Sequence, residues 1–323
     1  MIEQNRTIRI GTRSSLLART QAGMVKQMLE TRLPVGVSTP IELVFITTSG
    51  DQQQQRSLAE SGGKGLFIKE IETALLENRI DLAVHSAKDL PAQLAAGTII
   101  AGTPLRADPR DVWIGFEDRS IAQLPASAVV GTSSLRRQSQ LLAMRPDVTV
   151  EPLRGNIETR LRKVSDGLVA GTFLAQAGLD RTNLLPRGAV SLPLDEFIPA
   201  AGQGVLAVQA RTQDAAMRKL AGTINHNGTA AALAFERRVV AALAGNCLAP
   251  IGVCAMPREN PINNLHGWIV RAFLATPDGK KMSRATLLTQ DSSDAGLNSL
   301  YDLLLETLRQ RGSAEIMELI NSH

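Results

Sequence analysis

Short apolar runs alternate with amphipathic helical patterns over about the first 220 residues of the chain. Residues 66–78 (LFIKEIETALLEN), for example, place apolar side chains at the three- and four-residue spacing of one helix face. Such alternation predicts an α/β architecture with mainly parallel strands. The predicted strands lie between the helical patterns, at residues 8–10, 41–47, 82–85, 99–102, 129–130, 148–152, 173–175 and 205–209.

One pattern occurs twice, about 120 residues apart. Residues 8–19 (IRIGTRSSLLAR) and 128–138 (AVVGTSSLRRQ) each join an apolar strand to Gly-Thr, serines and a helix rich in Leu and Arg. Ser and Thr are good helix N-caps, and the amides and dipole of a helix start can bind an anion. The repeat suggests two similar lobes whose strand ends line a cleft. Two merely well-capped helices are the alternative.

The pattern changes after about residue 222. Residues 227–245 predict one long helix, which is followed by apolar strands and by an amphipathic helix at 299–312. This arrangement indicates a small α+β domain at the C-terminus. We therefore predict two α/β lobes and a third domain, with domain 1 at 1–104 and 203–222, domain 2 at 105–202 and domain 3 at 223–323.

The composition is that of an ordinary soluble globular protein, with 44% apolar and 20% charged residues. No apolar run reaches the roughly 18 residues of a membrane-spanning helix. The N-terminal residues lack the basic and then apolar pattern of a signal peptide, so a cytoplasmic location is expected. The presence of only two cysteines favours reduced thiols over a disulfide framework.

The positive charge is concentrated in one window. Residues 136–163 contain seven basic and three acidic residues, which equals the net charge of +4 of the whole chain. Arg outnumbers Lys by 27 to 8, and a guanidinium grips carboxylate or phosphate with two hydrogen bonds. An anionic small molecule is therefore the expected ligand. Nucleic acid is less favoured because aromatic residues make up only 3% of the chain.

The segment 82–92 (LAVHSAKDLPA) holds the strongest candidate for catalysis. A run of apolar strand residues ends in His, Ser, Lys and Asp, and ligands bind at the carboxyl ends of such strands. Asp89 is a candidate general acid or base, or a counter-ion for a cationic intermediate. The alternative is that Lys88 and Asp89 form a solvated pair in a turn. The segment 153–160 (LRGNIETR) adds two arginines to the candidate anion site.

Several other chemistries find no support. The segment GGKG at 62–65 lacks the spacing of a P-loop, and no Gly-x-Ser-x-Gly elbow is present. Four scattered histidines and two cysteines give no zinc-binding spacing, so no metal is expected.

The two cysteines lie in different contexts. Cys254 falls in an apolar run and is predicted to be a core residue. Cys247 follows the long helix in a turn, where its type alone leaves a ligand, a nucleophile and an attachment point open. Residues 49–63 are polar and flanked by glycine, and they predict a loop that is either a lid or an inert surface segment.

Ten segments carry a resemblance that spans nearly the whole chain. They occur in the order GTRSSLLARTQA, GGKGLFIKEIE, DLAVHSAKDLP, DPRDVWIG, VGTSSLRRQSQL, LRGNIETRL, AGLDR, AAGQGVLAVQAR, INHNGTAAALAFER and NCLAPIG. Together they resemble porphobilinogen deaminase, also called hydroxymethylbilane synthase. The resemblance implies two lobes like those of type II periplasmic binding proteins, a small C-terminal α+β domain and a monomer. It implies an enzyme that joins four porphobilinogen molecules head to tail, releases ammonia and yields 1-hydroxymethylbilane for tetrapyrrole synthesis.

The resemblance also implies roles for particular residues. Cys247 corresponds to the cysteine that holds one dipyrromethane cofactor per chain through a thioether, and Asp89 corresponds to the catalytic aspartate. Porphobilinogen carries an acetate and a propionate, which arginines and helix starts can bind. Phe67 could pack on a pyrrole ring, although a core role is an equal alternative. The expected cofactor- and substrate-binding residues are Arg13, Ser14, Gln21, Lys64, Phe67, Ser86, Lys88, Thr132, Ser133, Ser134, Arg136, Arg137, Arg154, Gly155, Arg160 and Gln203.

The chain departs from the family pattern at three places. Glu60 stands where many members have Lys, Asn246 precedes the cysteine where many have Gly, and Ala170-Gly171 replaces an Asp-Ala pair. These changes concern supporting residues, so we expect an active enzyme. Two alternatives are a non-catalytic two-lobed binding protein, which leaves the third domain and its cysteine unexplained, and a nucleic-acid binder.

Overall fold

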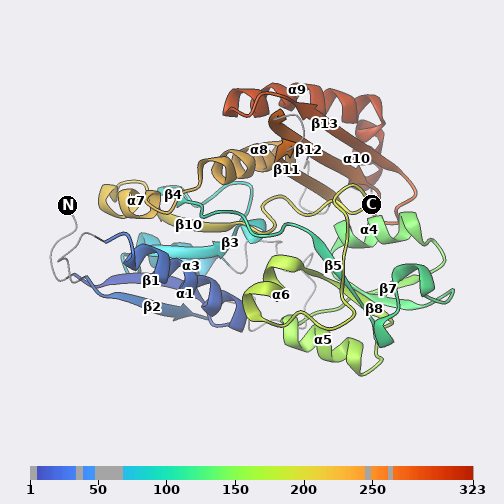
Figure 1. Cartoon of the computed structure of the whole chain (residues 1–323), viewed down its shortest axis with the longest axis horizontal. Coiled ribbons are helices and arrows are strands. Elements are labelled where there is room, and N and C mark those ends of the chain that lie inside the picture. Colours follow the sequence, from blue (N-terminus) through green and yellow to red (C-terminus); the bar gives the residue numbers. More distant parts are fainter. Residues whose placement is uncertain (1–5, 34–38, 48–67, 244–248, 261–264, 323) are drawn as a thin grey trace. The chain divides into compact units, whose positions relative to one another are not determined.

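The computed structural model describes residues 6–33, 39–47, 68–243, 249–260 and 265–322 (Figure 1). The chain divides into two compact units. One unit comprises Met1–Ala107 and Gly204–Ala230, and the other comprises Asp108–Gln203 and Ala231–His323.

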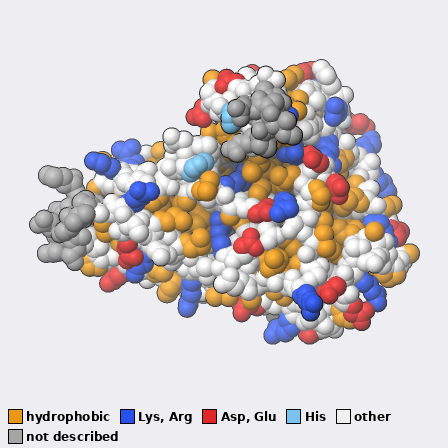
Figure 2. Space-filling view, in the orientation of Figure 1, with side chains coloured by type: hydrophobic (Ala, Val, Ile, Leu, Met, Phe, Trp, Pro, Cys, Tyr) orange, Lys and Arg blue, Asp and Glu red, His pale blue; other side chains and the backbone are white. Residues whose placement is uncertain are grey.

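One face of the molecule carries side chains of both signs of charge. On the face that Figure 2 shows, Lys and Arg side chains are interspersed with Asp and Glu. The net charge of +4 is therefore not gathered into one basic field in this view. Among the helices of the described residues, none has the length and apolar character needed to cross a membrane.

The first unit is built on a five-stranded sheet with the order β2-β1-β3-β10-β4. We call this sheet and its helices the first lobe. β1, β2 and β3 are parallel, and β10 is antiparallel to both of its neighbours, β3 and β4. The strands are β1 (Ile8–Arg13), β2 (Ile41–Ile46), β3 (Leu82–Ser86), β4 (Thr98–Gly102) and β10 (Leu206–Arg211), and the helices are α1 (Leu16–Glu30), α3 (Lys69–Leu76), α7 (Ala215–Gly222) and the short 3₁₀ helix η2 (Ala87–Asp89).

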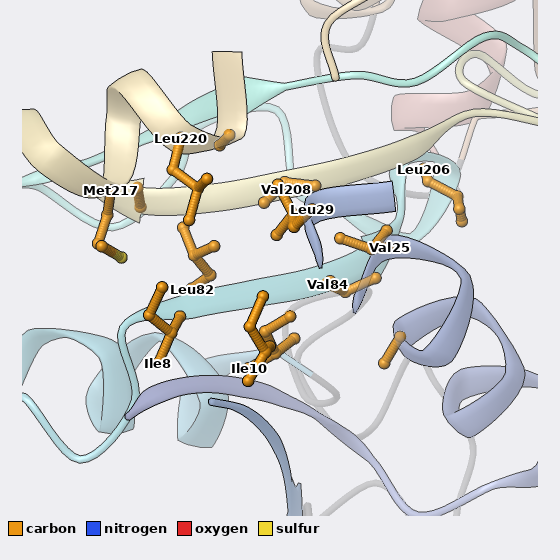
Figure 3. Packing of buried hydrophobic residues seen from close by; sticks show 14 residues of the cluster. Ile8, Ile10, Val25, Leu29, Leu82, Val84, Leu206, Val208, Met217 and Leu220 are labelled. Atoms are coloured by element: carbon orange, nitrogen blue, oxygen red, sulfur yellow. The ribbon is translucent and has the colours of Figure 1, made fainter. Parts of the chain in front are cut away.

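Helices cover both faces of this sheet. Alternate residues of the strands, such as Ile8 and Leu82, pack with side chains of α1 and α7 in one buried cluster (Figure 3). On the opposite face, Ala83 packs with Ile71 and Leu75 of α3. Because both faces are buried, the central strands are apolar almost throughout, as the sequence pattern predicted.

The second unit contains a sheet that repeats the pattern of the first. Its order is β7-β6-β8-β5-β9, with three parallel strands followed by β5, which is antiparallel to β8 and β9. We call this sheet and its helices the second lobe. It comprises β5 (Asp111–Gly115), β6 (Val129–Gly131), β7 (Thr149–Glu151), β8 (Gly171–Ala175), β9 (Val190–Ser191), α4 (Leu135–Met144), α5 (Ile157–Ser165), α6 (Gln176–Thr182), η3 (Phe116–Asp118) and η4 (Ile121–Gln123).

The repeated sequence pattern reflects this repeated topology. β1 and β6 each occupy the second position of their sheet, and each leads directly into the helix that carries the Gly-Thr-Ser start. The prediction of two similar α/β lobes is thereby confirmed.

A three-stranded antiparallel sheet with the order β11-β12-β13 forms a C-terminal domain in the second unit. Phe235 of α8 and Leu304 of α9 pack on the same face of this sheet. Cys254 on the other face is fully buried against Ile198 and Phe273, so the prediction of a core cysteine is confirmed. The elements are α8 (Asn227–Leu243), β11 (Ile251–Asn260), β12 (Leu265–Ala275), β13 (Met282–Thr289), α9 (Asp294–Gln310) and α10 (Ser313–Asn321).

The predicted strands are all found, and the expected α/β class with a small C-terminal α+β part is confirmed. β5, β9 and β13 are not among the predicted strands. The helix predicted at 66–78 is observed as Lys69–Leu76, and residues 66 and 67 lie outside the described residues, as does the loop predicted at 49–63.

Candidate active site

A pocket in the first lobe lies at the carboxyl ends of two neighbouring parallel strands, β1 and β3. Asp89 is reached through η2, which follows β3 immediately, and its side chain is exposed. The sequence-predicted residues Arg13, Gln21, Ser86 and Asp89 are all brought together here. The pocket is lined by Thr12, Arg13, Ser15, Leu17, Ala18, Gln21, Ile68, Ile71, Val84, His85, Ser86 and Asp89.

Hydrogen bonds fix the polar wall of this pocket. The Ser86 Oγ atom lies 2.9 Å from Nε2 and 3.1 Å from Oε1 of the buried Gln21, which joins the end of β3 to α1. Thr12 Oγ1 lies 3.3 Å from the carbonyl oxygen of Val84 and donates toward it. The Ser15 side chain caps α1 by accepting from the Ala18 amide. Predicted Ser14, just before this cap, is exposed, and predicted Lys88 is half-buried.

His85 is a pocket residue that the sequence analysis did not select. It is 6% exposed, and its Nε2 atom lies 3.0 Å from Oε1 of Gln209 on β10. Burial lowers the pKa of His85 to about 4, and the nearby charges of Glu72 and Asp89 only partly offset this effect. The imidazole is therefore neutral at physiological pH. The signal that would have found His85 is its position at the start of the polar run that ends in Asp89, four residues later.

In the second lobe, the helix start of α4 differs in its capping from that of α1. Ser134 is the N-cap residue, but its side chain accepts no capping hydrogen bond. Instead, Thr132 Oγ1 accepts from the Ser134 amide at 3.1 Å, and Ser133 Oγ donates to the Leu153 carbonyl at 3.2 Å. The three predicted residues Thr132, Ser133 and Ser134 are thus brought together at one helix start.

Arg136 and Arg137 have a structural role that the sequence analysis did not predict. Both are buried and share the carboxylate of Asp111, at 2.7 Å from Arg136 Nη1 and 2.7 Å from Arg137 Nη2. Arg136 Nη1 also donates to the Ile198 carbonyl, and Arg137 Nη1 to that of Phe173. Two guanidinium groups against one carboxylate leave this trio with one net positive charge. The binding of a ligand carboxylate by the two arginines stays a prediction.

The segment from Arg154 to Arg160 is shaped by a glycine and a helix cap. Gly155 has φ of +116°, and a Cβ atom there would lie 2.7 Å from Thr159 Cγ2. Asn156 caps α5 by accepting from the Thr159 amide at 2.8 Å, and Arg160 Nε donates to the Gly155 carbonyl at 2.8 Å. The predicted residues Arg154, Gly155 and Arg160 therefore meet at the start of α5.

The remaining predicted residues are placed as follows. Gln203 is fully buried, and its Nε2 atom donates to the Pro109 carbonyl at 2.8 Å. This hydrogen bond joins the segment before β5 to the segment before β10. Lys64, Phe67 and Cys247 lie outside the described residues, as do Glu60 and Asn246. Within the described ranges no group of His, Cys, Asp and Glu side chains has the arrangement of a metal site.

The departure at Gly171 has a physical reason. A Cβ atom at this position would lie 2.3 Å from Cζ2 of Trp113 and 2.8 Å from the Ile114 carbonyl oxygen. Gly171 on β8 pairs with Gly115 on β5, and Trp113, two residues before Gly115, pairs with Phe173, whose ring meets the indole edge to face at 5.0 Å between ring centroids. The missing side chain therefore makes room for the tryptophan.

An α/β fold that places a carboxylate beside hydrogen-bond donors at the carboxyl end of a strand is the arrangement expected of an enzyme for an anionic small molecule. The family model for "Porphobilinogen deaminase, dipyromethane cofactor binding domain" matches residues 8–219. A porphobilinogen deaminase of Alkaliphilus metalliredigens is 38% identical over 317 residues, which cover 98% of this chain and 96% of that protein. The chloroplastic porphobilinogen deaminase of Oryza sativa subsp. japonica is 43% identical over 273 residues, covering 84% and 75% respectively. The chain belongs to the porphobilinogen deaminase family.

The family, the activity and the cofactor that the ten segments implied are thereby confirmed. The chain is a transferase of tetrapyrrole synthesis that polymerises porphobilinogen and uses a dipyrromethane cofactor. Among solved structures, it is similar to a YaeC-family lipoprotein of Enterococcus faecalis, with a TM-score of 0.41 and 14% identity over 69% of this chain and 91% of the other. YhfZ of Shigella flexneri gives a TM-score of 0.37 and 16% identity, covering 73% and 96% respectively.

The donor set of the first-lobe pocket fits the dipyrromethane. Pyrrole N–H groups need acceptors, which the Asp89 carboxylate provides, and acetate and propionate groups need donors, which Arg13, Gln21 and Ser86 provide. Cys247, the predicted attachment residue, lies outside the described residues.

Proposed function

We propose that Asp89 is the catalytic residue of this enzyme and that Cys247 is the attachment point of its cofactor. The observation that carries the proposal is the position of Asp89. Its carboxylate is exposed at the carboxyl end of a parallel strand, in a pocket whose other polar residues include Arg13, Gln21 and Ser86.

Asp89 has two tasks in this proposal. Its carboxylate accepts hydrogen bonds from pyrrole N–H groups and so orients the ring that reacts. When ammonia leaves the substrate, positive charge develops on the pyrrole, and a carboxylate beside that ring stabilises it. The same carboxylate can carry the proton that the new pyrrole–pyrrole bond releases.

The dipyrromethane, when bound, supplies the nucleophilic pyrrole carbon to which the first substrate unit is added. The chain's own residues bind and orient. Arg13, together with Gln21 and Ser86, would hold acetate and propionate groups in the first lobe. The start of α4 and the arginines of the second lobe, Arg136, Arg137, Arg154 and Arg160, are the corresponding candidates there.

An intact-mass measurement on the native enzyme tests the attachment site. The wild type should be heavier than its sequence by two pyrrole units, and Cys247→Ser should lack this increment. Cys254→Ala is the matched control, because Cys254 is the other cysteine of the chain and is buried in the core. An active wild type of unmodified mass, or an increment retained by Cys247→Ser, would refute the assignment.

We also propose that the enzyme works as a cytoplasmic monomer without a nucleic-acid partner. The interspersed charges of Figure 2 support the last point. Light scattering tests the oligomeric state, and a salt-dependent affinity for DNA at physiological ionic strength would contradict the absence of a nucleic-acid partner.

A further inference from the structure

Three buried side chains form a hydrogen-bonded series beneath the Asp89 pocket. His85 Nε2 lies 3.0 Å from Gln209 Oε1, and Gln209 Nε2 lies 2.7 Å from Glu72 Oε1. The series joins β3, β10 and α3, and Gln209 Nε2 also lies 2.7 Å from Thr98 Oγ1 on β4. All three members of the series are at most 9% exposed.

The donor and acceptor of each hydrogen bond in this series can be assigned, and they determine which ring nitrogen of His85 carries the proton. Only the amide nitrogen of Gln209 can donate to the carboxyl oxygen of Glu72, which already accepts from the Ala95 amide at 3.1 Å. The amide oxygen of Gln209 then faces His85 and must accept from it. The imidazole therefore carries its proton on Nε2, and in the neutral ring Nδ1 is left with a lone pair.

The neutral state of the ring follows from its surroundings. Burial lowers the pKa of His85 to about 4, while the carboxyl groups of Glu72 on α3 and Asp89 on η2 act in the opposite direction. Nδ1 is thus a hydrogen-bond acceptor and not a donor at the pH of the cytoplasm.

His85 lines the same pocket as Asp89, and among the described residues nothing hydrogen-bonds to its Nδ1 atom. We propose that His85 is a substrate-binding residue whose Nδ1 accepts a hydrogen bond from an N–H group of the substrate, either a pyrrole N–H or the ammonium. The proposal rests on the proposed function, since it takes this pocket to be the place where the pyrrole binds. Glu72 and Gln209 are positioning residues that hold the acceptor in this tautomer.

Two substitutions of His85 separate this role from a purely structural one. The Oδ1 atom of Asn can occupy the position of Nδ1, while the amide nitrogen of Gln can occupy the position of Nε2 and keep the bond to Gln209. We expect His85→Asn to stay within about 10-fold of the wild-type kcat/KM, and His85→Gln to lose about 100-fold, mostly through KM. Equal losses, or a better His85→Gln, would mean that the histidine serves only the buried network and would overturn the proposal.

A second test uses the wild-type enzyme, so its result does not depend on whether a variant folds. Proton–nitrogen NMR of ¹⁵N-histidine-labelled enzyme distinguishes the two neutral tautomers, and the His85→Asn spectrum assigns the signal. We expect the Nε2–H tautomer, unchanged from pH 8 down to about pH 5. An Nδ1–H tautomer, or protonation near the ordinary pKa of about 6.5, would overturn the proposal.

The intact mass of each variant shows whether the cofactor is bound, and this distinguishes a failure of the His85 proposal from a failure of the proposed function. If the wild type lacks the pyrrole increment or turnover, the proposed function has failed, whatever His85 does. If the wild type is loaded and active and the variants are loaded, the order of their KM values reports on His85 alone.

Discussion

Arg136 on α4 and Asp111 on β5 form a buried ion pair, with 2.7 Å between Nη1 and Oδ2. Asp111 has no exposed surface, and Arg137 uses the same carboxylate. Removing this one charge would leave two guanidinium groups buried in the second lobe. We expect Asp111→Asn to destabilise the protein by about 3–5 kcal/mol, seen as a fall in the thermal midpoint of the second unit.

Asp108→Asn is the matched control for this change. Asp108 lies three residues earlier and pairs with Arg110, but both side chains are partly exposed to water. A loss of about 1 kcal/mol or less is expected there. Similar losses for the two variants would show that burial of the Asp111 carboxylate is not what makes it important.

Asp89→Asn should abolish turnover while leaving the fold intact. The side chain is exposed, so the free energy of unfolding should change by about 0.5 kcal/mol or less. Loss of the carboxylate removes both charge stabilisation and proton transfer, for which a fall in kcat of at least about 100-fold is expected. Steady-state kinetics and thermal unfolding check the two parts, with Glu77→Gln, another exposed carboxylate of the first unit, as the control. Near-normal turnover would remove Asp89 from its proposed role.

Gly171→Ala should destabilise the second lobe because the new methyl group meets the indole of Trp113. The overpacking is expected to cost about 1–3 kcal/mol. Trp113→Leu should relieve part of this cost, which a double-mutant cycle measures as a coupling between the two positions. Gly23→Ala is the control, since a Cβ atom on this residue of α1 meets nothing within 4 Å, and it should stabilise by about 0.5–1 kcal/mol. Additive effects at 171 and 113 would contradict the steric explanation.

His85 should make the protein less stable as the pH falls from about 6.5 to about 4. In the unfolded chain the imidazole takes up a proton near its ordinary pKa of 6.5, whereas burial lowers the pKa in the folded protein to about 4. Between these values only the unfolded state binds the proton, so acid favours unfolding by at most about 3 kcal/mol. His85→Gln should lack this component. Identical slopes of thermal midpoint against pH in both proteins would show that His85 titrates normally.

Most strands of the two lobes could be predicted because they read as short apolar runs, and inner strands such as β3 and β8 are buried on both faces. β5 escaped prediction because it begins with a charged residue, Asp111, and the two arginines that pair with this carboxylate follow some 25 residues later, on a helix. Nothing in a run of residues shows which acid will pair with which base. For the same reason, the sequence predicted Arg136 and Arg137 only as ligand-binding residues, and their pairing with Asp111 was not foreseen.

The candidate site could be predicted where the chain itself brings residues together. Asp89 follows its strand directly, and the Gly-Thr-Ser helix starts are continuous segments. His85 was missed because its importance depends on Gln209, which lies 124 residues away in the sequence and contacts it only through the pairing of β10 with β3. Burial and tautomer are properties of that pairing and leave no trace in the local pattern.

β10 lies between β3 and β4 in the first sheet, although it follows them in the chain by more than a hundred residues. During synthesis on the ribosome, the first lobe therefore lacks an inner strand until Arg211 has emerged, while every strand of the second lobe has been made once Ser191 is present. The lobe that begins first is completed last. Asp89 and its pocket accordingly belong to a lobe whose sheet stays incomplete until the strands of the second lobe have been synthesised.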